Sequence, residues 1–344
     1  MDASWLSLFW ASLIAFAILV YVVLDGYDLG VGILFGTTQD EGYRGTMMNA
    51  IAPFWDGNEV WLITAGGVTF AAFPATYAMM FSSLYSPLML ILFALIFRGV
   101  AMAFRGEVDS PRWKAFWDGC LVVGSFLPAL LLGVAFANIF RGLPIDAAGI
   151  YQGNLFTLLN PYGLAGGVLF VCLFLVHGSL WLAVKTEGAL QARAGAMAAR
   201  LWPVLLVVAA MFLLGTRFQT PLFNNYMARP VLLLIPTLAV ASLICTYVLI
   251  RQAAWWKAWF SSSLTIVSVT LFGVVGLYPN LFPSRLDPAA SLTAFNSASS
   301  PLTLKIMLGV ALTFVPLVIA YQIWVHFLFK GKVKEQDVTL DEGY

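Results

Sequence analysis

The stretch VWLITAGGVTFAAFPATYAMMFSSLYSPLMLILFALIF, residues 60–97, contains no Asp, Glu, Lys or Arg. A helix needs about 20 mostly apolar residues to cross the roughly 30 Å hydrocarbon core of a bilayer, so this stretch is too long for a single span. Proline cannot donate the backbone hydrogen bond of a helix interior, and its ring clashes with the preceding turn. Pro74 therefore marks the break, and we expect one helix over about 51–73 and the next over about 77–102.

The same search for long charge-free runs predicts seven further spans. They lie at about 4–35, 118–140, 161–184, 198–216, 230–250, 258–280 and 304–329. Composition agrees, because 61% of the residues are hydrophobic and 10% are charged, where soluble domains carry about 25% charged residues. We therefore predict an all-α integral membrane protein of about nine transmembrane helices, forming a single domain over residues 1–344. The net charge of +1 gives no reason to expect a nucleic-acid partner.

The distribution of basic residues predicts how the chain is oriented. Lys and Arg concentrate in the short cytoplasmic loops of membrane proteins. With nine spans and the N-terminus outside, most Lys and Arg of this sequence fall on the cytoplasmic side. The C-terminal tail, residues 330–344, is then cytoplasmic.

Ionisable residues occur where a membrane helix should be apolar. Six lie within or at the ends of the predicted spans: Asp25, Asp28, Asp56, Glu59, Arg98 and Asp118. Residues three apart, such as Asp25 and Asp28, share one face of a helix, and Asp56 and Glu59 repeat the spacing. Counting along the helices places all six in the cytoplasmic half of the membrane. Five carboxylates cannot all be ionised beside one guanidinium at low dielectric, so this pattern predicts a path for proton uptake.

A structural interpretation of the same residues stays open. Together with Trp55 and Asn58, the charged groups could cap helices and form interhelical hydrogen bonds that hold a bundle together. In that case Arg98 is the counter-ion of a buried acid.

Few residues are candidate cofactor ligands. The sequence holds two histidines, His177 and His326, and a single histidine on a membrane helix is more typical of a hydrogen-bonded interior group than of a haem ligand. Cys120, Cys172 and Cys245 are far apart in apolar stretches, so we expect buried thiols and neither disulfides nor a metal site. No nucleotide-binding glycine motif or metal-ligand spacing is present.

Two longer motifs carry a resemblance to a known family. DGYDLGVG (25–32) and IAPFWDGNEVWL (51–62) together resemble the signature of subunit II of the cytochrome bd-type quinol oxidases. Shorter stretches continue it in order along nearly the whole chain: FPATY (73–77), RWKAFWDG (112–119), GVAFAN (133–138), NPYGL (160–164), YP (278–279) and SSPLTL (299–304).

The resemblance implies an architecture and a set of partners. It implies two four-helix bundles plus one peripheral helix, in a heterodimer with a subunit I that carries haem b, haem d and the main quinol site. The complex reduces dioxygen to water with quinol electrons and cytoplasmic protons, in the cytoplasmic membrane of a prokaryote. This chain would bind no haem itself. Some members add a small accessory subunit, and some hold a quinone in this subunit as a structural lipid.

The resemblance also implies roles for site residues. Asp25 and Asp56, with Glu59 beside them, match a proton route, although some members have a neutral Gln at the position of Glu59. An interior polar cluster is implied for four further residues: Asp28, Arg98, Asp118 and Trp55. The connection 217–229 is shorter than in some members, which puts any partner contact there in doubt.

Two other classes of function are compatible with acids inside helices. A proton-coupled secondary transporter or channel is one, but such proteins commonly show inverted repeats with broken helices at the midplane, and the sequence shows neither. An assembly scaffold is the other, and it predicts normal turnover after Asp25 and Asp56 are neutralised together.

Overall fold

The computed structural model describes residues 4–333, and most of them are helical. The long helices are α1 (Ser4–Leu34), α3 (Trp55–Ala72), α5 (Tyr85–Phe104), α6 (Pro111–Arg141), α8 (Pro161–Lys185), α9 (Gly188–Gln219), α11 (Leu234–Arg251), α12 (Trp255–Leu277) and α13 (Pro301–Leu328). The short elements are η1 (Phe35–Thr37), α2 (Glu41–Ile51), α4 (Pro74–Ser83), α7 (Leu155–Leu158), α10 (Phe223–Ala228), η2 (Pro230–Leu233), η3 (Pro288–Ala290) and the antiparallel strands β1 (Asn280–Phe282) and β2 (Leu292–Thr293).

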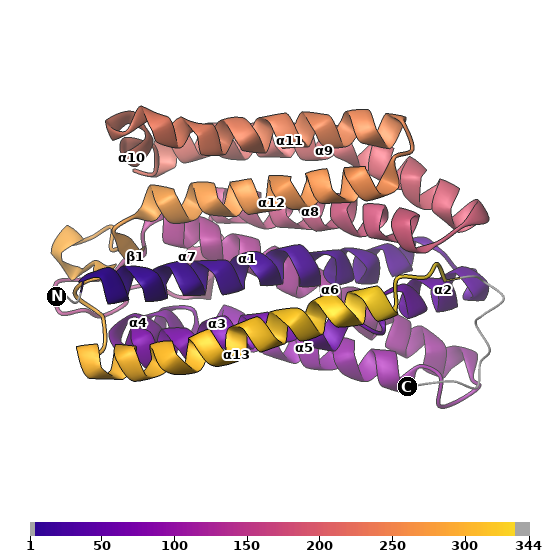
Figure 1. Cartoon of the computed structure of the whole chain (residues 1–344), viewed down its shortest axis with the longest axis horizontal. Coiled ribbons are helices and arrows are strands. Elements are labelled where there is room, and N and C mark those ends of the chain that lie inside the picture. The colour runs from indigo at the N-terminus through magenta and orange to yellow at the C-terminus, as the bar shows by residue number, and fades with distance from the viewer. Residues whose placement is uncertain (1–3, 334–344) are drawn as a thin grey trace.

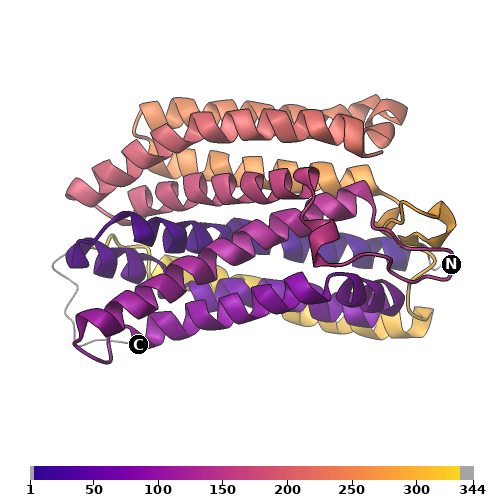
Figure 2. The ribbon, with the colours of Figure 1, turned by 180° about the vertical axis from the view of Figure 1, so that it is seen from behind.

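The long helices lie side by side along the long axis of the molecule (Figures 1 and 2). In both views α9 and α11 form one edge, α8 and α12 come next, and α1 lies near the middle. Helices α3, α5 and α13 lie on the other side of α1. The main helix pairings are α8 with α9, α6 with α8, α11 with α12, α5 with α6, and α1 with α3 and α8.

Within residues 4–333, eight helices are long and apolar enough to cross a membrane, namely every long helix except α3. Helix α3 has 18 residues, and its Asp56 and Glu59 lower its mean hydropathy. Eight crossings would bring the chain back to the side where it began. However, α1 begins and α13 ends at opposite ends of the molecule (Figure 1), so α3 completes a ninth crossing.

The structure differs from the expected helix bounds in two places near prolines. The predicted helix 51–73 begins later than expected, at Trp55, because Pro53 lies in the turn that separates α3 from α2, which ends at Ile51. The predicted helix 77–102 is divided at Leu84, since Pro87 cannot donate a backbone hydrogen bond to the preceding turn. The predicted break at Pro74 is confirmed, with Pro74 at the first turn of α4.

Two other helices are longer than predicted. Helix α6 begins at Pro111 and α9 at Gly188, where the sequence led us to expect 118 and 198. Both extensions contain Lys or Arg, so a search for charge-free runs stops short of the true helix end. An amphipathic turn beyond the hydrocarbon core keeps its helical hydrogen bonds while its charges reach water.

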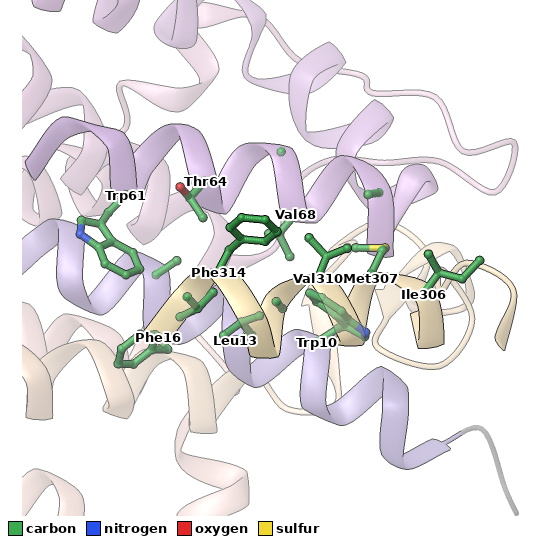
Figure 3. Close-up of a pocket in the computed structure, with 15 residues that line it drawn as sticks. Trp10, Leu13, Phe16, Trp61, Thr64, Val68, Ile306, Met307, Val310 and Phe314 are labelled. Atoms are coloured by element: carbon green, nitrogen blue, oxygen red, sulfur yellow. The ribbon is translucent and has the colours of Figure 1, made fainter. Parts of the chain in front are cut away.

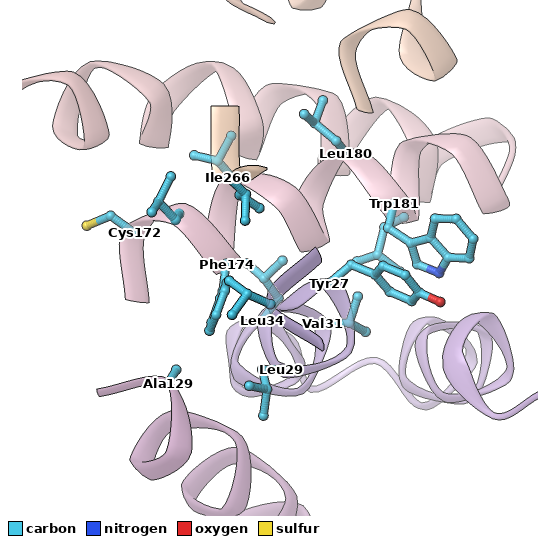
Figure 4. Close-up of a cluster of buried hydrophobic side chains, with 14 of the residues drawn as sticks. Tyr27, Leu29, Val31, Leu34, Ala129, Cys172, Phe174, Leu180, Trp181 and Ile266 are labelled. Atoms are coloured by element: carbon cyan, nitrogen blue, oxygen red, sulfur yellow. The ribbon is translucent and has the colours of Figure 1, made fainter. Parts of the chain in front are cut away.

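The core is centred on α1 and α8, whose backbones approach closely. A Cβ atom built on Gly30 of α1 would lie 1.9 Å from the carbonyl oxygen of Phe174 in α8, and one built on Gly178 would lie 2.7 Å from the Gly30 backbone. Only glycine permits this approach. Beside it, the rings of Tyr27 and Trp181 stack at 4.2 Å between centroids (Figure 4).

Surface residues of this protein are largely apolar, as expected for helices that face lipid. Cys172 is buried and Cys120 is partly buried, but Cys245 is exposed on α11. The prediction of three buried thiols was therefore wrong for Cys245, because an apolar residue on a membrane helix has no need to face inward.

Helix α13 lies at the periphery, with Leu304 as its one buried residue in the described range. Polar contacts hold it at both ends. Trp10 Nε1 donates to the carbonyl of Leu304 at 3.2 Å, and at the far end Lys185 Nζ donates to the carbonyls of Phe329 and Gly331.

Candidate functional site

A buried group of polar side chains, which we call the inner cluster, lies where α1, α3 and α5 meet. It consists of Asp25 and Asp28 from α1, Asn58 and Glu59 from α3, and Arg98 from α5. Arg98 Nη2 lies 2.6 Å from Asp25 Oδ1 and 3.1 Å from Glu59 Oε1. Asp25 and Arg98 are almost fully buried, and Glu59 keeps 18% of its side chain exposed. One guanidinium nitrogen thus contacts two carboxylates from two different helices.

Asp28 occupies a separate part of the inner cluster. Asn58 Nδ2 donates to Asp28 Oδ2 at 2.7 Å and to the Tyr27 hydroxyl at 2.8 Å. The Tyr27 hydroxyl in turn lies 3.4 Å from His326 Nε2 on α13. The amide therefore fixes Asp28 in place and connects it to the peripheral helix.

Several buried polar atoms of the inner cluster have no hydrogen-bond partner within residues 4–333. They are Arg98 Nε and Nη1, Asp25 Oδ2, Asp28 Oδ1, Asn58 Oδ1, Glu59 Oε1 and the nearby Tyr21 hydroxyl. Buried polar groups are nearly always hydrogen-bonded to protein or to ordered water. Donors and acceptors gathered in this way suit water molecules, each of which makes about three hydrogen bonds when buried.

The charges of the inner cluster do not balance. Among the described residues, the guanidinium of Arg98 contacts two carboxyl groups, those of Asp25 and Glu59, and the third carboxyl group, that of Asp28, accepts from the neutral amide of Asn58. A buried carboxylate without a counter-ion costs several kcal/mol, roughly the penalty that protonation removes. The arrangement therefore suits acids that hold and release a proton.

A second group, the end cluster, lies between α2, the end of α5 and the start of α6. It consists of Glu41, Arg44, Arg105 and Asp118. Asp118 accepts from Arg44 at 2.7 Å and from Arg105 at 2.5 Å, and Arg105 Nη2 contacts both Glu41 oxygens at 2.8 and 3.0 Å. Here two carboxylates meet two guanidiniums, so the charges balance.

The arginines of the end cluster lower the pKa of Glu41. Partial burial alone would raise the pKa of Glu41, but hydrogen bonds and positive charge from Arg105 and Arg44 together lower that pKa below its ordinary value. The ionised form is therefore the stable one, as expected for a structural ion pair.

The structure divides the residues that were expected to form one interior polar cluster. Arg98 and Asp28 lie in the inner cluster, and the Trp55 ring centroid is 6.0 Å from the Arg98 guanidinium. Asp118 does not join them, because it pairs with Arg44 and Arg105 in the end cluster. The family resemblance implied one cluster, but the residue of α5 that lies level with Asp118 is Arg105, two helical turns beyond Arg98.

The three residues expected on a proton route are near one another but differ in exposure. Asp25 is buried, Glu59 is partly exposed, and Asp56 is exposed on α3, one helical turn before Glu59. Asp56 forms no ion pair within the described residues, although its charge acts on Glu59.

Sequence reasoning missed three members of the end cluster. Arg44 and Arg105 lie outside the predicted spans, yet they are only 8% and 7% exposed. Glu41 was not considered. The spacing of Glu41 and Arg44, three residues apart, is the signal that could have indicated a helix carrying an ion pair.

Neither histidine fits as a haem ligand, because the ring nitrogens already have partners. His177 lies 3.1 Å from the Ser262 hydroxyl and 3.1 Å from the Val23 carbonyl. His326 Nδ1 lies 2.8 Å from the carbonyl of Gln322, and its Nε2 lies near Tyr27. In the described part of the chain, no three His, Cys, Asp or Glu side chains group as metal ligands would.

Comparison with known proteins gives one consistent result. Residues 6–329 match the family described as Cytochrome bd terminal oxidase subunit II. The chain is 35% identical to cytochrome bd-I ubiquinol oxidase subunit 2 of Escherichia coli strain K12, over 98% of this chain and 97% of that protein. It is 35% identical to cytochrome bd ubiquinol oxidase subunit 2 of Bacillus subtilis strain 168, over 95% of this chain and 97% of that one.

A solved structure shares the fold. The bd oxidase of Geobacillus thermodenitrificans superposes with a TM-score of 0.78 at 17% identity, covering 94% of this chain and 98% of the matched chain. The chain therefore belongs to the cytochrome bd terminal oxidase subunit II family, as a multi-pass membrane subunit of a complex that includes a partner subunit.

Proposed function

We propose that the chain is the haem-free second subunit of a terminal oxidase that oxidises quinol and reduces dioxygen to water in aerobic respiration. In this proposal it assembles with a haem-bearing subunit I and delivers cytoplasmic protons for water formation. Family membership supports this function over a secondary transporter. The observation that carries proton delivery is the unbalanced inner cluster, in which Arg98 contacts the carboxyl groups of Asp25 and Glu59 and a third carboxyl group, that of Asp28, is bonded only to a neutral amide.

The exposure of the acids suggests the order in which a proton meets them. Asp56 is exposed, Glu59 is one turn further along α3, and Asp25 is buried on the far side of Arg98. A proton taken up at Asp56 would pass to Glu59 and then to Asp25. Because Arg98 Nη2 contacts both Glu59 and Asp25, protonation of one strengthens the hold of Arg98 on the other and couples the two steps.

Asp28 has a different role in this proposal. Its link to Tyr27 and His326 passes through Asn58, whose amide nitrogen donates to both neighbours. An amide has no titratable proton at physiological pH, so the hydrogen bonds from Asn58 orient the neighbouring groups but do not conduct protons. Asp28 therefore holds the cluster together, and the route runs through Asp56, Glu59 and Asp25.

The position of Asp56 also suggests which face meets subunit I. Asp56 shares an exposed stripe of α3 with Val60, Ile63, Gly67 and Phe70. An ionisable side chain facing lipid is costly, and such groups almost always face protein or a water-filled cavity. We therefore assign this stripe of α3, with Asp56 at the entry of the route, to the interface with the haem-bearing subunit.

A cavity between α1, α3 and α13 supports a structural lipid in this subunit. Its volume is about 350 Å³, and its lining is apolar (Figure 3). The polar atoms among its lining residues are already engaged, since Trp10 donates to Leu304, Trp61 to Gln322 and Thr64 to Val60. These contacts suit a hydrocarbon chain, such as the tail of a quinone, rather than a hydrogen-bonded quinone ring.

The orientation we propose places the end cluster toward the cytoplasm. The C-terminal ends of α1, α8 and α13 lie at that end of the molecule (Figure 1). Basic residues near it, including Lys185, Arg251, Lys257 and Lys330, follow the positive-inside rule. The N-terminus would lie outside, and residues 334–344 of the cytoplasmic tail lie beyond the described residues.

The test begins with purification of the chain from native membranes and a reduced-minus-oxidised spectrum of what accompanies it. We expect a co-purifying membrane subunit with the bands of haem b and haem d. Oxygen consumption per haem is then compared between wild type and the double variant Asp25→Asn/Asp56→Asn, with the exposed Asp109→Asn as control. Loss of turnover with intact haem bands supports proton delivery, whereas normal turnover in the double variant would leave only a scaffold role.

A further inference from the structure

A pocket unconnected with the inner cluster opens at the end of the molecule that holds the last turns of α8 and α13. Its volume is about 280 Å³, and it lies between the end of α8, the start of α9 and the first turn of α12. The charged residues that line it are Lys257 and Lys332, and no carboxylate among residues 4–333 lines it. The pocket is therefore a concentration of positive charge at a membrane boundary.

The position of Lys332 is fixed by hydrogen bonds on both sides of it. Lys185 Nζ, from α8, donates to the carbonyl of Gly331 at 2.9 Å, and the backbone N–H of Val333 donates to the carbonyl of Lys185 at 2.7 Å. The chain that leaves α13 is thereby fastened onto α8. Lys332 is thereby held at the pocket that Lys257 also lines.

The backbone at the start of α12 adds N–H donors, whose partial positive charge has the same sign as the charge of the lysines. Helix α12 has 23 residues, and no side chain caps its N-terminus at Ala254. The turn before it includes Ala253 at φ 52°, a conformation that alanine rarely adopts. The free N–H groups and the dipole at such a helix start favour a phosphate group.

An apolar ridge leads away from the pocket along α12. Trp256, Phe260 and Leu264 are spaced four residues apart on one face, and they are 48%, 61% and 40% exposed. The rings of Trp256 and Phe260 stack at 5.9 Å between centroids. Tryptophan is typical of the membrane interface, and the residues beyond it extend toward the hydrocarbon core.

We propose that this pocket binds an anionic phospholipid. Its phosphate lies between Lys257 and Lys332 at the first turn of α12, and one acyl chain follows the ridge of Trp256, Phe260 and Leu264. Basic pockets between transmembrane helices on the cytoplasmic side are known to bind acidic head groups. The ridge is what distinguishes a lipid from a free phosphate ion, which would use only the two lysines and the helix start.

The test uses the protein in the complex in which it is purified, placed in nanodiscs of phosphatidylcholine with a small share of phosphatidylglycerol. The phosphatidylglycerol that remains bound is quantified by native mass spectrometry. The variant Lys257→Gln/Lys332→Gln is compared with Lys305→Gln/Arg285→Gln, which removes the same charge from exposed positions at the opposite end. All four side chains are exposed, so neither variant disturbs the core.

We expect wild type and the control to retain phosphatidylglycerol in preference to phosphatidylcholine. The variant at Lys257 and Lys332 should lose about twenty-fivefold in affinity, since each lysine near an anionic lipid contributes about fivefold. Phe260→Ala/Leu264→Ala should also weaken retention. Unchanged retention in the lysine variant, or equal loss in the control, would overturn the proposal. Displacement of the lipid by inorganic phosphate would identify an anion site and overturn the lipid assignment.

Discussion

At the scale of single residues, Arg98 and Asp118 show two uses of buried charge. Arg98 Nη2 contacts Asp25 and Glu59 while Asp28 lies close by, so acids outnumber the base. Asp118 is held by both Arg44 and Arg105, and Glu41 completes a balanced set. An unbalanced cluster suits proton exchange, and a balanced one suits mechanical attachment of α2 to α5 and α6.

The first prediction compares acids within the inner cluster. Asp25→Asn should lower oxygen consumption per haem by about tenfold or more, because it removes a proton-exchanging group. Glu59→Gln should lower it less, because the family resemblance includes members with a neutral Gln at this position. Asp28→Asn should have a smaller effect on turnover, since Asn58 separates Asp28 from the route. The measurement is oxygen uptake by the purified complex with quinol in excess. Equal losses in all three variants would contradict the separate role given to Asp28.

The second prediction concerns the end cluster. Asp118→Asn leaves Arg44 and Arg105 with only Glu41, and removing one partner from buried ion pairs costs about 3–5 kcal/mol. We expect a lower unfolding temperature and a lower yield of complex, with turnover per haem unchanged in the molecules that assemble. Thermal unfolding and oxygen uptake measured on the same preparation separate these effects, and a stable but inactive variant would place Asp118 on the proton route.

The third prediction follows from the lowered pKa of Glu41. A group whose pKa is lower in the folded state stabilises the fold above its unfolded pKa, near the ordinary value of 4.5. That contribution disappears as the pH falls through the lowered value. Thermal stability should therefore decline less between pH 5 and pH 3, roughly the range set by that linkage, in Glu41→Gln than in wild type. Because Glu41 is 53% exposed, the difference should stay within about 1 kcal/mol, and no difference would show that the contacts contribute nothing.

At the scale of helices, the contact between α1 and α8 is the most restrictive. In Gly30→Ala, the added Cβ would lie 1.9 Å from the Phe174 carbonyl, so the helices must separate. Overpacking of this kind typically costs about 1–3 kcal/mol, and the acids of α1 would shift with their helix. The control is Gly119→Ala on α6, where an added Cβ meets no atom within 4 Å. We expect Gly30→Ala alone to reduce the yield and unfolding temperature of the complex, and equal behaviour of both variants would contradict close packing here.

The sequence predicted a helix break at proline but not the helix ends that lie beyond charged residues. Pro74 marked a true break because proline acts locally, through its own ring and missing N–H. The extents of α6 and α9 were underestimated because charged residues end a hydrophobic run without ending a helix. The arginine that pairs with Asp118 depends on how far α5 and α6 are shifted along each other. A shift of two helical turns would place Arg98 beside Asp118, where the structure has Arg105.

At the scale of the whole molecule, the all-helical membrane fold was predictable, since each hydrophobic span depends on a local stretch of sequence. The link from Asp28 through Asn58 and Tyr27 to His326 was not predictable, because it joins residues about 300 positions apart through packing alone. The proposed interface on α3 likewise rests on exposure, which only the assembled fold reveals.

Helix α13 is the last helix of the described chain, and it closes one wall of the cavity shared with α1 and α3. During biosynthesis the ribosome delivers α13 after every other helix has left it, so the cavity does not exist until that final segment docks. A hydrocarbon guest can therefore be held there only after α13 has docked. Because the cavity stays partly open in the finished fold, that guest can exchange with lipid of the surrounding bilayer.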